Sequence, residues 1–254
     1  MKRIKIGADP EFCILTPTNK LLNARHICLD GNKRKKFGRE NVAFELRPDP
    51  SYNIFVIIAN IRHLLVNTIN KYPILKKCKF IAGHCVVDQP IGGHIHFEMD
   101  GDGELNDKLF KYFIDKVLYR GLAEIIDDKP GLRMRRKYEY GKRRDFRNDN
   151  GVSIEYRSSI SWLYSPSVAF IYLTLAKICG LLYLNRYKFN INIDTINNTK
   201  RSGRILLRRI ITLVECQYEL MEEKDIYKCV ALIKRLPTVV NINWSKDFKS
   251  NWQI

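Results

Sequence analysis

Two histidines and a glutamate alternate with apolar residues in the segment 92–98. Successive side chains of an extended strand point to opposite faces, so His94, His96 and Glu98 would share one face and the apolar residues the other. The two glycines ahead of them would let backbone or a ligand approach closely. Imidazole and carboxylate groups at this spacing can bind a divalent cation, although two histidines on a half-buried strand can equally be hydrogen-bonded residues without a catalytic role.

A second acidic motif lies near the N-terminus, where Asp9 and Glu11 flank a proline. Proline cannot donate a hydrogen bond within a sheet, so it belongs at an end, an edge or a bulge of a strand. We therefore expect a strand, a bend and a second strand over residues 4–14. Both carboxylates would then be displayed at a strand end.

Two further segments place a glutamate two residues before an arginine, Glu45 with Arg47 and Glu155 with Arg157. Each pair would share one face of a short strand. Together the four segments supply more carboxylates than nitrogen or sulfur ligands, which favours Mg²⁺ or Mn²⁺ over zinc. Arginines beside such carboxylates can bind phosphoryl oxygens, so these patterns indicate nucleotide chemistry.

In this order the four segments resemble the phage-type COOH-NH2 ligases (amidoligases) of the glutamine synthetase and glutamate-cysteine ligase superfamily, over roughly residues 4–165. The resemblance implies an α+β fold in which an antiparallel sheet forms a half-open funnel. It also implies two or three Mg²⁺ or Mn²⁺ ions between ATP and a substrate carboxylate. The implied enzyme is an ATP-dependent carboxylate-amine ligase, which forms an amide bond through an acyl phosphate.

The resemblance also implies roles for individual residues. The implied metal ligands are Asp9, Glu11, Glu45, His94 and Glu155. The implied catalytic residues are Arg157, which would contact the transferred phosphate, Arg47 and Glu155. The implied nucleotide-binding residues are Arg144, Arg147 and His96, with Arg133, Arg135, Arg136 and Arg143 as competing arginines. One further acid of the superfamily has no firm counterpart, and Asp30 or Glu40 could supply it.

The charge balance of 44 Lys and Arg against 27 Asp and Glu gives a formal +17. Residues 129–147 hold nine of the basic residues and a second cluster spans residues 33–39, both in expected loops. Such an excess would attract an acidic peptide or protein as the carboxylate substrate, to be joined to an amine. Nucleic acid is a secondary candidate partner, and a merely solvated basic surface is the alternative.

The same histidine pair also has the form found in rolling-circle nicking endonucleases, which are metal-dependent HUH enzymes that attack single-stranded DNA with a tyrosine. Tyr138 and Tyr140 lie in the basic segment and could serve as that nucleophile. This alternative gives no reason for the three acidic motifs outside the histidine pair. A binder of nucleic acid or acidic protein that keeps the scaffold without catalysis is the third interpretation.

Apolar spacing predicts helices over 52–69, 107–126, 167–184, 203–220 and 224–235. We expect residues 1–165 to form the catalytic sheet with two helices, and residues 166–254 to form a helical region packed on it within the same domain. The tail 241–254 could either dock or fray. Seven cysteines without a CxxC pair predict no disulfide framework, and no apolar run approaches the length of a membrane span. The chain is expected in the cytoplasm, that of the host if it is viral, and not at a membrane.

Overall fold

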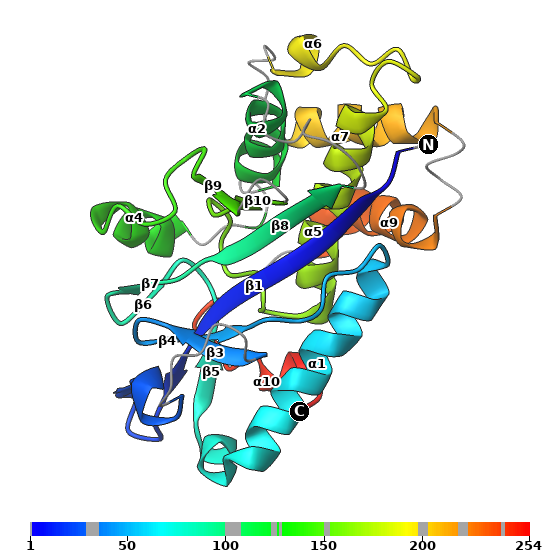
Figure 1. Cartoon of the computed structure of the whole chain (residues 1–254). Helices are drawn as coiled ribbons and strands as arrows, with labels where there is room; N and C mark the ends of the chain where they lie inside the picture. Colours follow the sequence, from blue (N-terminus) through cyan, green and yellow to red (C-terminus); the bar gives the residue numbers. More distant parts are fainter. Residues whose placement is uncertain are drawn as a thin grey trace.

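The computed structural model describes residues 2–28, 36–99, 108–122, 126, 129–149, 153–197, 203–217, 223–239 and 242–254. Its framework is an antiparallel sheet with the strand order β3-β4-β1-β8-β10-β9 (Figure 1). These strands are β3 (Phe37–Glu40), β4 (Ala43–Leu46), β1 (Ile4–Leu15), β8 (Gly93–Met99), β10 (Ser153–Tyr156) and β9 (Phe146–Asp149). Two short strands, β2 (Leu21–Leu22) and β5 (Lys79–Ile81), pair with the end of β1, and β6 (Cys85–Val86) and β7 (Gln89–Pro90) form a separate hairpin.

The helical elements lie mainly around α5, which packs against β1 and β8 and contacts α1, α2 and α9. Their bounds are η1 (Ala24–His26), α1 (Ile54–Lys71), η2 (Pro73–Lys77), α2 (Lys108–Asp115), the π-helical segment η4 (Lys116–Leu122), α4 (Lys129–Lys137), α5 (Pro166–Leu184), α6 (Ile193–Asn197), α7 (Gly203–Glu215), α9 (Lys224–Val239) and α10 (Lys249–Trp252). The α+β class with a large antiparallel sheet is therefore confirmed.

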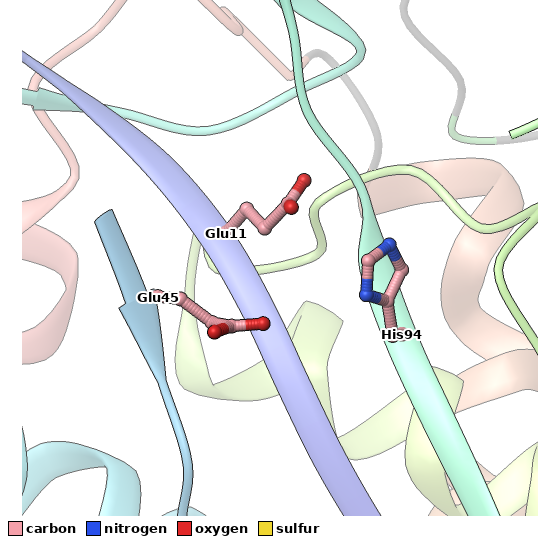
Figure 2. Close-up of side chains that lie close together, drawn as sticks. All are labelled: Glu11, Glu45 and His94. Carbon is pink, nitrogen blue, oxygen red and sulfur yellow. The ribbon is translucent and has the colours of Figure 1, made fainter. Parts of the chain in front are cut away.

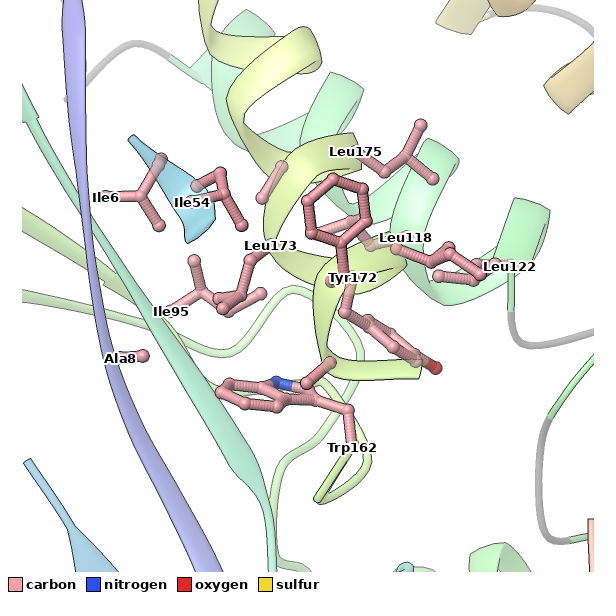
Figure 3. Packing of buried hydrophobic residues seen from close by; sticks show 14 of the residues in the cluster. Ile6, Ala8, Ile54, Ile95, Leu118, Leu122, Trp162, Tyr172, Leu173 and Leu175 are labelled. Atoms are coloured by element: carbon pink, nitrogen blue, oxygen red, sulfur yellow. The ribbon is translucent and has the colours of Figure 1, made fainter. Parts of the chain in front are cut away.

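One face of the sheet is apolar and covered by helices. Ile6 and Ala8 of β1 and Ile95 of β8 are buried in the same cluster as Leu173 of α5 and Trp162 (Figure 3). The residues between them in sequence point to the opposite face. The period-two pattern of the strands thus separates a packing face from a polar face, and the polar face remains available for chemistry.

Local sequence signals explain the two long helices of this layer. The Asn53 side chain caps α1 by accepting a hydrogen bond from the Phe55 N–H, and the Ser165 side chain caps α5, which begins with a proline. By length and composition alone α5 could cross a membrane, so the expectation that no apolar run approaches that length is wrong. In this fold 94% of its most apolar window is buried, as expected for a central core helix.

Several expectations for local structure need correction. β1 is one continuous strand, because Pro10 lies opposite Gly93 at the end of the β1–β8 ladder, after which β1 pairs with β4. The basic residues 129–137 form helix α4, whereas a loop was expected. The expected helix 107–126 changes to π-helical geometry after Asp115. The second expected loop holds basic residues 33–35, which lie outside the described residues.

The C-terminal tail docks on the body of the protein. The Trp252 indole N–H donates to the Leu163 carbonyl at 2.7 Å, and the Phe248 backbone N–H donates to the Phe80 carbonyl at 2.9 Å. Both aromatic side chains are buried. Of the two alternatives for this segment, docking is the one found.

Candidate active site

Sheet register brings the sequence motifs together on the polar face. Glu11 of β1 lies opposite Glu45 of β4, and Asp9 lies opposite His94 of β8. Farther along β8, His96 lies opposite Glu155 of β10. Residues from four strands, distant in sequence, therefore form one row of acidic and imidazole groups across the sheet.

The centre of this row is a cluster of Glu11, Glu45 and His94, whose side chains point toward one another from β1, β4 and β8 (Figure 2). One ligand atom from each lies within 4.8 Å of the others, and all three side chains are buried. Two carboxylates and an imidazole at this separation are a plausible donor set for a divalent cation with open positions.

The electrostatics of the cluster favour a cation. Burial, with the neighbouring Glu45 carboxylate, raises the pKa of Glu11 to about 8, and burial, with the charge of Asp9, raises the pKa of Glu45 to about 7. Two desolvated carboxyl groups so close together resist simultaneous ionisation. A bound cation would offset that cost, so the residues present fit a metal site.

His94 is oriented by Glu155. Burial and the charge of Arg157 lower the pKa of His94 well below its usual range, so the imidazole is neutral. Its Nδ1 lies 3.2 Å from Glu155 Oε1, and its Nε2 lies 3.2 Å from the Tyr140 hydroxyl oxygen. Glu155 thus lies on the Nδ1 side of His94 and is not one of the three clustered residues.

The predicted arginines surround the same carboxylates. Arg147 and Arg157 lie 2.6 Å and 3.5 Å from different oxygens of Glu155. Arg47 pairs with Glu45, and its guanidinium lies across Gly38, where an added Cβ would collide with it at 2.1 Å. The pair expected from sequence spacing, a glutamate with the arginine two residues later, therefore forms in both strands.

Asp9 and His96 form a second polar pair beside the cluster. His96 Nε2 lies 2.9 Å from Asp9 Oδ2, and both side chains are partly exposed. Burial, with the charge of Asp9, raises the pKa of Glu45 and of Glu155. Asp9 and His96 thus lie at the open side of the buried cluster.

Tyr140 belongs to the site, although its place in the basic segment indicated it only as a candidate nucleophile. Its hydroxyl lies 2.8 Å and 2.9 Å from the two oxygens of Glu11 and 3.2 Å from His94 Nε2. Burial, together with the negative charge of Glu11, raises its pKa far above the usual range. A neutral, hydrogen-bonded phenol is a poor attacking group, so this geometry disfavours the nucleophilic role.

The remaining predicted residues are not among the three clustered side chains. The Arg144 guanidinium lies 5.0 Å from the ring centroid of Tyr112 on α2, and its backbone N–H donates to Asp115. Arg135 is fully buried and binds backbone carbonyls, whereas Arg133 and Arg136 are exposed on α4 and Arg143 pairs with Asp115. Glu40 contributes to the raised pKa of Glu11, and Asp30 lies outside the described residues.

The antiparallel sheet that carries these buried carboxylates, the neutral histidine and the arginines belongs to a fold found in other solved structures. Similar structures include the ligase PafA in complex with the prokaryotic ubiquitin-like protein Pup, with a TM-score of 0.59 and 8% identity over 99% of this chain and 65% of PafA. A bifunctional glutathione synthetase from Pasteurella multocida has a TM-score of 0.55 and 10% identity over 98% of this chain and 48% of that one.

The model of the phage phiEco32-like COOH.NH2 ligase-type 2 family matches residues 6–254, and the chain therefore belongs to this family. The match extends through the C-terminal third, beyond the roughly 4–165 expected from the motifs. The family and the fold expected from the sequence are confirmed. No curated protein matches the chain. The chain spans about half of the glutathione synthetase and about two thirds of PafA.

Proposed function

We propose that this protein is an ATP-dependent carboxylate-amine ligase that forms an amide bond through an acyl phosphate. The observation that carries the proposal is the buried Glu11, Glu45 and His94 cluster beside the arginines on Glu155, in a chain of the COOH.NH2 ligase family. Such a site combines donors for a divalent cation with donors for phosphoryl oxygens.

The carboxylates and the imidazole would hold the metal. Glu11, Glu45 and His94 would bind one Mg²⁺ or Mn²⁺ ion, and Asp9, with His96 beside it, offers ligands for a further ion, for two or three in total. When bound, these ions neutralise the triphosphate and polarise the transferred phosphoryl group. Glu155, which lies 3.2 Å from His94 Nδ1, would orient the imidazole so that its Nε2 can act as a ligand.

The arginines would stabilise charge on the moving phosphoryl group. Arg157 and Arg147 are held by Glu155 and Arg47 by Glu45, so their guanidinium groups are oriented before substrate arrives. In the first step a carboxylate oxygen of the substrate attacks the γ-phosphorus and ADP leaves. In the second step the amine nitrogen attacks the acyl carbon, loses a proton and expels inorganic phosphate. Neither step needs a covalent nucleophile from the protein.

The carboxylate donor is proposed to be an acidic peptide or protein. Exposed basic residues lie along the segment from α4 to β9, which reaches the site. They are Arg133, Arg136, Lys137, Lys142, Arg144 and Arg147. Such a surface would concentrate an acidic partner near the cluster. The Pup complex of the structurally similar PafA supports a protein or peptide substrate.

The nicking-endonuclease alternative has little support in this site. Its two histidines would have to bind one cation together, but His94 faces Glu155 and Tyr140 whereas His96 faces Asp9. The candidate nucleophile Tyr140 is bound to Glu11. Nothing in this geometry favours DNA cleavage over ligation.

A screen for amine-dependent ADP release tests the proposal. The protein would be incubated with ATP, Mg²⁺, a panel of glutamate- and aspartate-rich peptides, and single amino acids or ammonium as amines. We expect ADP release that requires both a peptide and an amine, and a product whose mass equals their sum minus water. A metal-dependent tyrosyl-DNA adduct with no ADP release in any mixture would refute the ligase assignment.

A further inference from the structure

We propose that Tyr140 is a gate on the metal site, with its hydroxyl in the position that a cation would take between Glu11 and His94. This inference rests on the metal site of the proposed function. The hydroxyl oxygen lies 2.8 Å and 2.9 Å from the two Glu11 oxygens and 3.2 Å from His94 Nε2. The hydroxyl therefore lies at the edge of the Glu11 carboxylate, where a ligand can contact both carboxylate oxygens at once.

A cation and the hydroxyl compete for this place. Ligand oxygens and nitrogens lie at about 2.0–2.2 Å from Mg²⁺ or Mn²⁺, so a cation shared by Glu11 and His94 would fall almost on the phenol oxygen. The phenol could stay only by becoming a ligand itself. A phenol is a weaker ligand for such a cation than a carboxylate.

The ring of Tyr140 has defined neighbours. Two guanidinium groups lie close to it, with Arg135 at 5.3 Å and Arg157 at 5.9 Å from the ring centroid. Arg135 is fixed by hydrogen bonds to the backbone carbonyls of residues 157–159. Gly141 permits the close approach, because it has φ +55° and an added Cβ would lie 1.8 Å from the Arg135 guanidinium.

The chain on the far side of Tyr140 is anchored, which limits how much of it could move. The Ser158 hydroxyl donates to the Lys142 carbonyl at 2.6 Å and accepts from the Asp145 N–H at 2.9 Å. Helix α4 ends at Lys137. A gate movement is therefore confined to residues 138–141, between the helix and the anchored turn.

The gate couples cation entry to the arrival of an anion. Arg157, which faces the Tyr140 ring, is also the arginine proposed to bind the transferred phosphoryl group. Phosphate oxygens at Arg157 would compete with the ring for the guanidinium and release the tyrosine. The cation would then enter together with the nucleotide and bind poorly alone, which limits unproductive metal loading.

Manganese titration of three proteins tests the gate. Binding of Mn²⁺ alone would be measured by electron paramagnetic resonance of the free ion for the wild type, Tyr140→Phe and Tyr138→Phe. The Tyr140→Phe variant keeps an aromatic ring beside the two guanidinium groups, and Tyr138 is a matched control that is 39% exposed. We expect Tyr140→Phe to bind Mn²⁺ about ten-fold more tightly or better, because the Tyr140 hydroxyl no longer competes for the Glu11 oxygens, and Tyr138→Phe to match the wild type.

Movement of the gate in the wild type is a second measurement. With 3-fluorotyrosine incorporated, the ¹⁹F resonance missing from Tyr140→Phe identifies Tyr140, and it should shift toward the exposed-tyrosine frequency when ATP and Mg²⁺ are added. Equal or weaker Mn²⁺ binding by folded Tyr140→Phe, or an unmoved resonance with nucleotide bound, would overturn the gate while leaving the ligase proposal intact. Failure of every protein to bind Mn²⁺ would overturn the gate and the metal site together.

Discussion

Replacement of Glu155 by glutamine should separate its role in the site from its role in folding. Glu155 is 1% exposed and lies 2.6 Å from Arg147, 3.2 Å from His94 Nδ1 and 3.5 Å from Arg157. Glutamine keeps the shape and one acceptor oxygen but removes the charge. Burial already raises the pKa of this carboxyl group, so a neutral side chain should be well tolerated in the fold.

The expected loss is in metal binding and turnover. Removing the carboxylate that orients a ligating histidine costs about 10- to 100-fold in metal affinity, or roughly 1.4–2.7 kcal/mol. The arginines also lose the charge that orients them, so turnover should fall on the order of 100-fold or more. Calorimetric Mn²⁺ binding and amine-dependent ADP release would measure both effects.

The control for this experiment is Glu139→Gln, which removes a charge from an exposed pair with Lys142. This variant should behave as the wild type, because exposed ion pairs contribute little. Unchanged ADP release by Glu155→Gln, in protein that melts like the wild type, would refute the reasoning that links Glu155 to His94 and the arginines.

Two further predictions concern stability. Because the pKa of Glu11 is raised to about 8 and that of Glu45 to about 7, the metal-free folded protein keeps protons that the unfolded chain has released above about pH 5. Its melting temperature should therefore fall as the pH rises through 7 and 8, and excess Mg²⁺ should flatten that slope; a slope of opposite sign would contradict the buried cluster. Asp225→Ala should destabilise the fold by about 2 kcal/mol in urea titrations, because it removes one of the two carboxylate partners of buried Lys177 and leaves Glu223 as the other. A loss under about 0.5 kcal/mol, the range of ordinary surface changes, would show that this pair is dispensable.

Much of the fold could be predicted because its elements bury one regular face. The stripe of Ile54, Ile57, Ile61 and Leu65 predicted α1, and all four are buried. Helix α4 could not be predicted because charged residues dominate its sequence. Its buried face includes Arg135, and arginine is a residue type that is expected at the surface. The sequence did not predict that β1 is continuous. At Pro10 this strand changes its pairing partner from β8 to β4, and that change depends on the neighbouring strands and not on the segment itself.

The site was predictable to the extent that strands determine it. Alternation placed Glu11, Glu45 and His94 on one face, and the sheet order then made them neighbours. Tyr140 reaches the cluster from a turn, and no periodic pattern in the sequence indicates which tyrosine contacts the cluster. Arg144 shares the basic segment with Arg147, but only Arg147 lies in a strand directly opposite Glu155.

Transfer of oxygen from the carboxylate to phosphate tests the central claim most directly. An acidic peptide active in the ADP-release screen would be labelled with ¹⁸O in its carboxyl groups and incubated with ATP, Mg²⁺ and the amine. An acyl-phosphate ligase leaves one ¹⁸O atom in each inorganic phosphate formed, which mass spectrometry detects. ATP consumption that yields unlabelled phosphate would contradict the ligase account.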